Sequence, residues 1–156
     1  MATQPDRSLR VSVWARYEEE LAPIVSRLPA GARKYALAVW HCDITDHRCI
    51  HDASVEAISV VEAGSGNAGE KRAMGIVVRL LAAHHDRHLL LKLTGVRRYT
   101  VEHPSPGTKM ADRGHGDVLD DSIRVTPDGH VLYSLNMEFA RLEVEAKDIE
   151  FSQQPV

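Results

Sequence analysis

The last third of the chain alternates regularly between apolar and polar residues. One face of residues 131–139 is apolar, and residues 142–146 repeat the pattern: Val131, Tyr133, Leu135, Met137, Phe139, then Leu142, Val144, Ala146. This alternation is typical of antiparallel strands with one buried face and one face in water. Pro127-Asp128-Gly129 precedes them and predicts a turn, because proline presets φ and glycine tolerates positive φ.

Further strands are predicted between Asp52 and Glu102. Ser54–Glu62 is rich in β-branched residues, Leu89–Thr94 alternates, and Val96–Glu102 follows a glycine. The apolar run Ala73–Ala82 fits either a strand or a helix, since periodicity alone does not decide such runs. Taken with the last third of the chain, these segments predict an antiparallel β-meander.

The N-terminal segments read differently. Tyr17, Leu21, Ile24, Val25 and Leu28 recur at helical spacing, although Pro23 interrupts the pattern. Gly31–Trp40 fits a second helix or a strand, and Leu9–Val13 a short strand. The sheet needs a cover for its apolar face, and the helices can supply it. The prediction is an α+β fold, an antiparallel β-meander sheet covered on one face by N-terminal helices, in a single domain over residues 1–156 with residues 1–8 and 152–156 as loose termini.

Composition narrows the function classes only modestly. The net charge of -3, 44% hydrophobic and 26% charged residues are ordinary for a soluble globular protein. No long basic stripe indicates nucleic-acid binding, and no apolar run approaches the ~20 residues of a membrane-spanning helix. The N-terminal residues lack an apolar core of signal-peptide length. We therefore expect a cytoplasmic protein whose two cysteines are free thiols.

The stretch Trp40–Asp52 concentrates the chemistry of the chain. It contains both cysteines, three histidines and three aspartates. Cys42, His47, Cys49 and His51 are the ligand types that zinc prefers, but their spacing does not match a standard zinc finger. With zinc bound, Asp46 or Asp52 could act as a base on metal-bound water, which predicts a metal-dependent enzyme. The alternative is a polar junction between helix and sheet.

A second candidate is the glycine-rich segment Glu62–Gly69. Gly64, Gly66 and Gly69 form a G-x-G-x-x-G pattern after a predicted strand, which resembles the first motif of S-adenosylmethionine-dependent methyltransferases. That resemblance implies a strand–loop–helix turn around the cofactor. Gly75 weakens the helix, and no acidic residue ends the next strand. A glycine-rich hairpin loop is the alternative.

Two histidine-containing segments remain. His115 and Asp117, with Asp120, Asp121 and His103, are groups that can perform acid–base chemistry or bind metal, or they belong to a solvated loop and ordinary strand surface. This loop, His103–Asp117, is long enough to suggest a functional role. The other segment, His84–His88, fits the exposed tip of a hairpin.

A broader pattern spans residues 50–151. Ile50-His51-Asp52-Ala53 leads into a strand, and it is followed by Leu89–Val96, Gly116–Ile123, Pro127–Leu135 and Leu142–Phe151. This succession resembles small uncharacterised bacterial α+β proteins that begin their sheet at an H-D-A turn, some of them immunity-protein-like. The resemblance implies a fold and no catalytic residues.

These observations favour a non-enzymatic binding protein that recognises another protein, with immunity-type recognition as one form of it. The alternatives are the metal-dependent enzyme using residues 42–51 and the methyltransferase-like protein using residues 62–69. An exposed edge strand would also be compatible with a homodimer.

Overall fold

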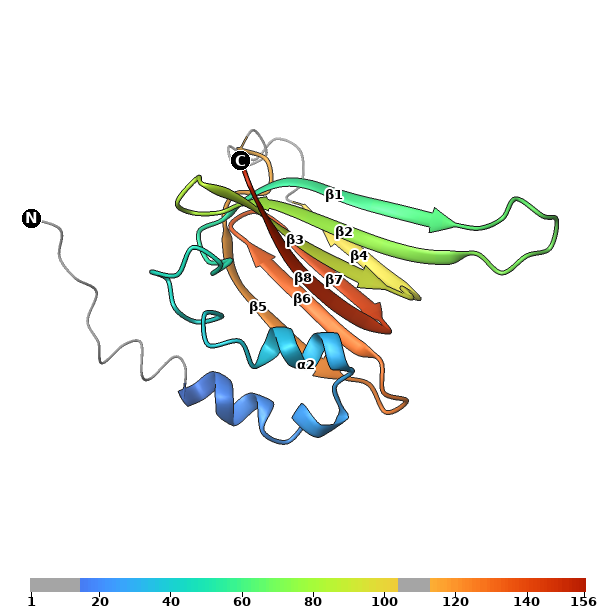
Figure 1. The fold of residues 1–156 in the computed structure, drawn as a ribbon, viewed down its shortest axis with the longest axis horizontal. Helices are drawn as coiled ribbons and strands as arrows, with labels where there is room; N and C mark the ends of the chain where they lie inside the picture. The colour runs from blue at the N-terminus through green and yellow to red at the C-terminus, as the bar shows by residue number, and fades with distance from the viewer. Residues whose placement is uncertain (1–14, 104–112) are drawn as a thin grey trace, which may run out of the picture.

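The computed structural model describes residues 15–103 and 113–156, which form three short helical segments near the N-terminus and eight strands. Figure 1 shows the strands arranged in two layers with α2 running across one side. The α+β class with antiparallel sheets is confirmed. The elements are helical residues 15–21, η1 (Val25–Arg27), α2 (Ala30–Ala36), β1 (Ser54–Ala63), β2 (Ala73–Leu81), β3 (Arg87–Thr94), β4 (Arg98–Glu102), β5 (Val118–Val125), β6 (Val131–Met137), β7 (Arg141–Ala146) and β8 (Asp148–Pro155).

The strands divide into two four-stranded sheets, with orders β1-β2-β3-β8 and β4-β7-β6-β5. Two long chain segments belong to both sheets, since β3 pairs with β8 and their continuations β4 and β7 pair with each other. The change of sheet occurs at Gly95 and Lys147. Gly95 has φ +59°, and a Cβ there would lie 2.6 Å from the Lys147 side chain. Strands that bend in this way form the corners between packed sheets.

The core lies between the two sheets. Leu89, Leu91 and Leu93 of β3 are fully buried, as are Tyr133 and Leu135 of β6. The alternation in residues 131–137 and 142–146 therefore predicted the buried face correctly. One end of the sandwich is closed by main-chain bonds between the chain before β1 and the start of β5, from Asp52 N to Val118 O and from Val118 N to Ala53 O, both 2.9 Å.

The N-terminal segment follows its prolines. The first described helix ends at Leu21, and a 3-10 turn replaces the continuous helix beyond Pro23. Gly31–Trp40 resolves as a helix over Ala30–Ala36, which begins directly after Pro29. Asp148 accepts hydrogen bonds from the amides of Gly31 (3.1 Å) and Ala32 (2.7 Å), so the free N–H groups at the start of α2 are satisfied by β8.

Several local predictions have definite outcomes. Ala73–Leu81 is a strand, and it pairs with β1 along its length. Residues 152–155, expected to be loose, are part of β8 because Arg87–Leu90 of β3 supply pairing partners. Residues 1–8, the proposed strand Leu9–Val13 and residues 104–112 of the long loop lie outside the described residues. Among the described residues, no helix is long and apolar enough to cross a membrane.

Candidate functional site

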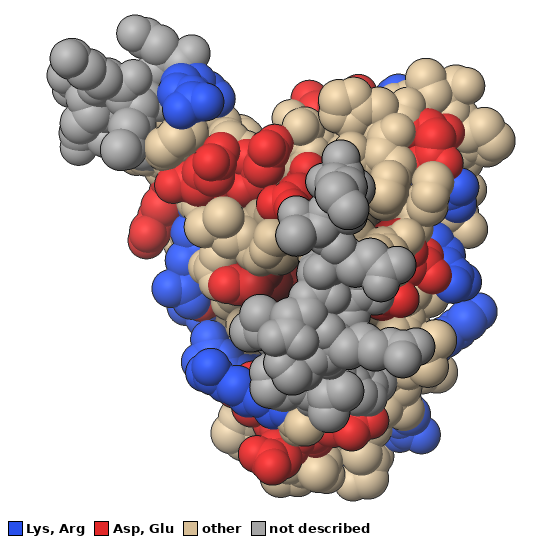
Figure 2. All heavy atoms as spheres, turned by 90° about the vertical axis from the view of Figure 1, so that its left-hand side faces the viewer, with Lys and Arg blue, Asp and Glu red and all other residues tan. Residues whose placement is uncertain are grey.

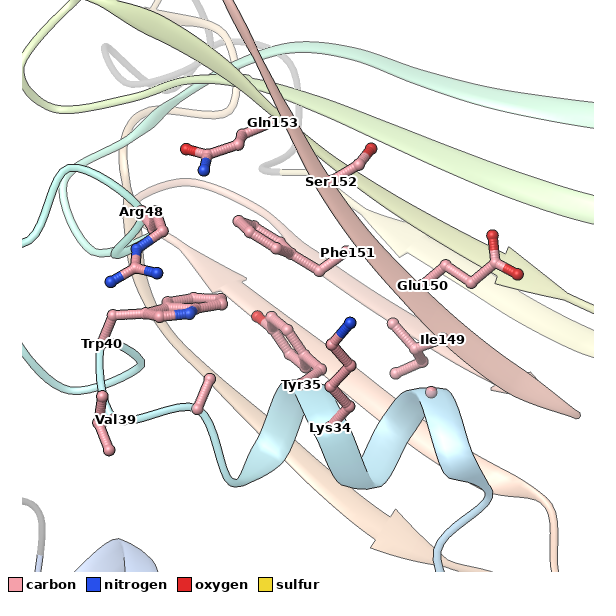
Figure 3. Close-up of a pocket in the computed structure, with 12 residues that line it drawn as sticks. Lys34, Tyr35, Val39, Trp40, Arg48, Ile149, Glu150, Phe151, Ser152 and Gln153 are labelled. Carbon is pink, nitrogen blue, oxygen red and sulfur yellow. The ribbon is translucent and has the colours of Figure 1, made fainter.

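A pocket of about 540 Å³ lies between α2 and β8. Figure 3 shows Phe151 pointing from β8 toward Trp40 and Tyr35, with Arg48 beside Trp40. The chain thus brings together two segments more than a hundred residues apart. The lining residues are Gly31, Lys34, Tyr35, Ala38, Val39, Trp40, Arg48, Ile149, Glu150, Phe151, Ser152 and Gln153.

Aromatic rings form the apolar part of the pocket. The ring centroids of Trp40 and Phe151 lie 4.4 Å apart, and those of Tyr35 and Phe151 lie 5.8 Å apart. Such pairs gain stability beyond simple area burial. The rings hold one another in place, so the apolar wall of the pocket is preformed.

A fixed cation borders this aromatic wall. The Arg48 guanidinium lies 5.8 Å from the Trp40 ring centroid, within the range of a cation–π contact. Asp46 accepts hydrogen bonds from Arg48 Nε (2.9 Å) and Nη2 (2.7 Å). Those hydrogen bonds, more than the charge itself, lower the pKa of Asp46 to about 2. Arg48 is therefore oriented before any ligand arrives. Lys34 is a second cation in the lining, and Glu150 an acid.

The segment after α2, which contributes Val39 and Trp40 to the pocket, also exposes apolar side chains. Leu37, Val39 and Ile44 are all exposed, and Val39 is 78% exposed while also lining the pocket. This segment lies on the left-hand side of Figure 1, and Figure 2 shows the molecule from that side. The acidic and basic side chains there form small groups of both signs. We use "recognition surface" for the pocket together with Leu37, Val39 and Ile44.

Behind the recognition surface lies a buried ion pair. His41, in the turn after α2, and Asp121, on β5, are 2.7 Å apart between Nε2 and Oδ1, and each side chain is only 4% exposed. The Tyr35 hydroxyl donates to the other carboxylate oxygen at 2.7 Å. His41 Nδ1 lies 3.3 Å from the Tyr35 carbonyl oxygen, which can only accept. Both ring nitrogens thus face acceptors, so the geometry fits an imidazolium paired with a carboxylate.

The pKa shifts agree with this assignment. Burial alone would lower the pKa of His41, but the Asp121 charge and hydrogen bond outweigh it and raise that pKa. Burial likewise opposes the charge on Asp121, and His41 together with the Tyr35 hydroxyl lowers its pKa. The Tyr17 ring stacks on His41 at 4.8 Å between centroids, which favours the cationic form.

Tyr133 lies next to the ion pair without joining it. Burial, followed by the Asp121 charge, raises the pKa of Tyr133 well above its ordinary value. Its hydroxyl is buried without a hydrogen-bond partner among the described residues, so it lies near the carboxylate but outside hydrogen-bond geometry. The ion pair is sealed from solvent and acts as an anchor that ties the 37–44 segment to β5.

The four candidate zinc ligands have separate environments. The buried Cys49 thiol donates to the His41 carbonyl oxygen at 3.4 Å, and Cys42 is half-buried. His47 Nδ1 bonds Asp86 at 2.7 Å, and His51 lies beside Asp52. Within residues 15–103 and 113–156, no group of three or more histidine, cysteine or acidic side chains is arranged to hold a metal ion. Burial raises the pKa of both thiols to about 11.

The glycine-rich segment is a hairpin loop. It joins antiparallel strands β1 and β2, so the helix that the methyltransferase motif requires is replaced by a strand. Figure 1 shows this hairpin projecting beyond the other strands. The loop amides of Ser65 and Gly66 each donate to the Glu70 carboxylate at 2.7 Å. The amides that could face a cofactor are thus occupied by a side chain of the same loop.

The histidines and aspartates of residues 103–121 that were candidates for acid–base chemistry make separate contacts in the structure. The rings of His103 and His115 lie 5.5 Å apart between centroids, while Asp117 accepts a hydrogen bond from Ser54 and Asp120 from Asn136. Burial, with His103 as a second cause, lowers the pKa of His115.

Asp121 is instead buried with His41, a pair that the sequence analysis missed. The available signal was alternation, because Asp121 shares a strand face with Ile123 and Val125. Lys34, Tyr35, Arg48 and Phe151 carried no motif and were missed as pocket residues.

No known protein family matches the chain, and no curated protein matches it either.

Proposed function

We propose that this protein is a non-enzymatic binding protein that recognises another protein through the recognition surface. The observation that carries the proposal is that Leu37, Val39 and Ile44 are all exposed in the short segment after α2 that also supplies Val39 and Trp40 to the pocket. Exposed apolar residues that gather in one place mark interaction sites more often than scattered ones do. Tryptophan, tyrosine and arginine also dominate the binding energy of protein interfaces.

The charges around the pocket describe the partner's chemistry. Arg48 and Lys34 contribute two positive charges to the lining and Glu150 one negative charge. Arg48 is held in place over Trp40, so little side-chain entropy is lost when it forms a contact. The surface therefore fits a protein segment that inserts an apolar or aromatic side chain and carries a carboxylate beside it. The resemblance to immunity-type proteins is a separate reason to expect a protein partner.

The burial of His41 and Asp121 favours a structural role for this pair over a catalytic one. His41 and Asp121 form the best-defined pair behind the pocket, yet both side chains are 4% exposed and bonded to each other. A catalytic base must come within hydrogen-bond reach of the proton it removes. Of the ionisable side chains that line the pocket, Tyr35 is bonded to Asp121 and Arg48 to Asp46, while Lys34 and Glu150 are the remaining acid–base groups.

The test uses one exposed position of the recognition surface and one exposed position elsewhere. Val39→Asp places a carboxylate in the apolar surface, and Val61→Asp makes the same change on β1, where the valine is 49% exposed. Each protein is used as bait in lysate from the native host, and captured proteins are quantified by mass spectrometry. The captured protein is then purified and its affinity for each bait measured by calorimetry.

We expect one stoichiometric partner that binds the wild type and Val61→Asp alike. Its affinity for Val39→Asp should fall at least about tenfold, because a charge buried in an apolar contact lacks a compensating partner. Equal affinity for all three baits, or no stoichiometric partner for the wild type, would contradict the proposal.

A further inference from the structure

A second exposed surface lies at the edge strand β4. This strand is at one end of the order β4-β7-β6-β5, and all five of its residues are exposed. Tyr99 stands opposite Val144 and Val101 opposite Leu142 in the β4–β7 register. Directly opposite residues share a face, and Val144 and Leu142 are fully buried. Tyr99 (41% exposed) and Val101 (43% exposed) therefore extend the apolar face of the sheet to an edge at which, within residues 15–103 and 113–156, no further strand pairs with β4.

Apart from its short length and the charges of Arg98 and Glu102, β4 lacks the features that usually protect an edge. Arg98–Glu102 contains no proline, glycine or lysine, and its pairing with β7 is regular from Arg98↔Glu145 to Glu102↔Arg141. Natural edge strands avoid pairing with other chains through prolines, bulges, lysines or inward-facing charges. The inward-facing positions of β4 hold a tyrosine and a valine instead.

We propose that β4 pairs with β4 of a second copy of this chain, antiparallel and about a two-fold axis that passes between the two Thr100 residues. The strand is self-complementary in this register. Arg98 would lie opposite the partner's Glu102, and Tyr99 opposite the partner's Val101. Because of the two-fold axis, each of these contacts occurs twice in the dimer, as an isologous interface requires.

The neighbouring strands support the same register. Arg98 already lies 3.4 Å from Glu145 and 3.7 Å from Glu143 on β7, and Glu102 stands opposite Arg141. Across the dimer, one row would read Glu145, Arg98, the partner's Glu102 and the partner's Arg141, with the sign of the charge alternating at every step. The apolar row would read Leu142, Val101, the partner's Tyr99 and the partner's Val144.

A shifted register loses this complementarity. Moving one copy by two residues keeps each side chain on its face but sets Arg98 opposite the partner's Thr100, so that neither Glu102 faces an Arg98 of the other copy. Because charges and apolar pairs both prefer the register centred on Thr100, that register is the specific one.

The first experiment measures mass in solution by sedimentation velocity on the full chain. The wild type should sediment as a dimer, at twice the 17.3 kDa of the single chain. Val101→Glu places a charge on the inward-facing side of the edge and should convert the protein to a monomer. Val61→Glu is the matched control and should remain dimeric, and circular dichroism verifies that both variants fold.

The second experiment tests the register by cysteine cross-linking in a Cys42→Ser background. Directly opposite residues have Cβ atoms about 4.5–5.5 Å apart, so Thr100→Cys should form an intermolecular disulfide under mild oxidation. Glu102→Cys places the two thiols four residues apart along the strands, about 13 Å, and should not cross-link with itself. It should cross-link when mixed with Arg98→Cys.

Any of three results would overturn the proposal. The first is a wild type that stays monomeric at about 100 µM, and the second is a Val101→Glu variant that stays dimeric. The third is Thr100→Cys cross-linking no faster than Glu102→Cys. The dimer is independent of the recognition surface, so Val39→Asp should remain dimeric even if it loses its protein partner.

Discussion

Replacing Asp121 by alanine should be among the most destabilising single substitutions in this protein. The change removes the acceptor of the His41 Nε2 bond and of the Tyr35 hydroxyl bond, both 2.7 Å, and leaves two polar groups buried without a partner. Breaking a buried ion pair by removing one member costs about 3–5 kcal/mol. Domains of this size are stable by only about 5–15 kcal/mol, so much of the total would be lost.

The asparagine variant separates charge from hydrogen bonding. Asp121→Asn keeps an oxygen that can accept from Tyr35 and an amide that can donate to a neutral His41, whose Nδ1–H still faces the Tyr35 carbonyl oxygen. Only the charge interaction is lost. We therefore expect a cost of about 1–2 kcal/mol, between wild type and alanine.

The way in which the cost of Asp121→Ala changes with pH tests the charged pair more sharply than the size of that cost. The raised pKa of His41 gives stability that is full below its unfolded value of about 6.5 and is lost as pH rises through the folded pKa. The lowered pKa of Asp121 gives stability present above about 3.9 and lost as pH falls through the folded pKa. Without Asp121, burial would lower the pKa of His41, so the alanine variant should lose stability on acidification below pH ~6.5. The cost of Asp121→Ala should thus be larger at pH 5.5 than at pH 8.5.

Urea unfolding followed by tryptophan fluorescence measures these differences, since the chain has two tryptophans. Asp120→Ala is the matched control, because Asp120 is the neighbouring aspartate on β5 and its residue is exposed. The control should change the free energy of unfolding by no more than about 0.5 kcal/mol. A cost of less than about 1 kcal/mol for Asp121→Ala, or an equal cost at both pH values, would refute the assignment of His41 and Asp121 as a charged pair.

Two further predictions concern the sheet corner and the thiols. Gly95→Ala should lower the free energy of urea unfolding by about 1–3 kcal/mol more than Gly129→Ala does. Both glycines have positive φ, but only a Cβ at Gly95 would meet the Lys147 side chain, at 2.6 Å. Equal costs would mean that the corner tolerates a side chain. The thiols of Cys42 and Cys49 should react slowly with a disulfide reagent at pH 7.5, because burial raises the pKa of both to about 11. Their reaction should become faster as the pH rises toward that value. Fast reaction at neutral pH would show that one of them is a thiolate.

The parts of the fold that the sequence predicted are those determined by local pattern. Val131, Tyr133, Leu135 and Met137 share one buried face because a strand has a period of two, and Pro127-Asp128-Gly129 forms a turn for reasons internal to those residues. The division into two sheets was not predictable in this way. It depends on the close approach of Gly95 to Lys147, residues 52 positions apart, and no window of sequence contains both.

The candidate site, like the division into two sheets, depends on residues that are far apart in the sequence. Asp121 could have been placed in the core from its alternation with Ile123, yet its partner His41 lies 80 positions away. The cysteines and histidines around His41 were predicted as metal ligands because of their composition. In the structure, Cys49 bonds a main-chain carbonyl and His47 bonds Asp86, so these two side chains make separate contacts. The pocket itself is formed by residues 31–48 and 149–153, which meet only when β8 lies against α2.

The buried ion pair and the recognition surface are physically connected. His41 directly follows Val39 and Trp40, and its partner Tyr35 both hydrogen-bonds Asp121 and lines the pocket. A charged pair at the base of a short irregular segment restricts the positions that the segment can adopt, which keeps an exposed Val39 from collapsing onto the surface. The asparagine variant isolates this effect, because it should stay folded while the charge attraction is lost. If the ion pair positions the segment, Asp121→Asn should weaken partner binding although residue 121 does not line the pocket. If it serves stability alone, the affinity of the folded variant should match that of the wild type.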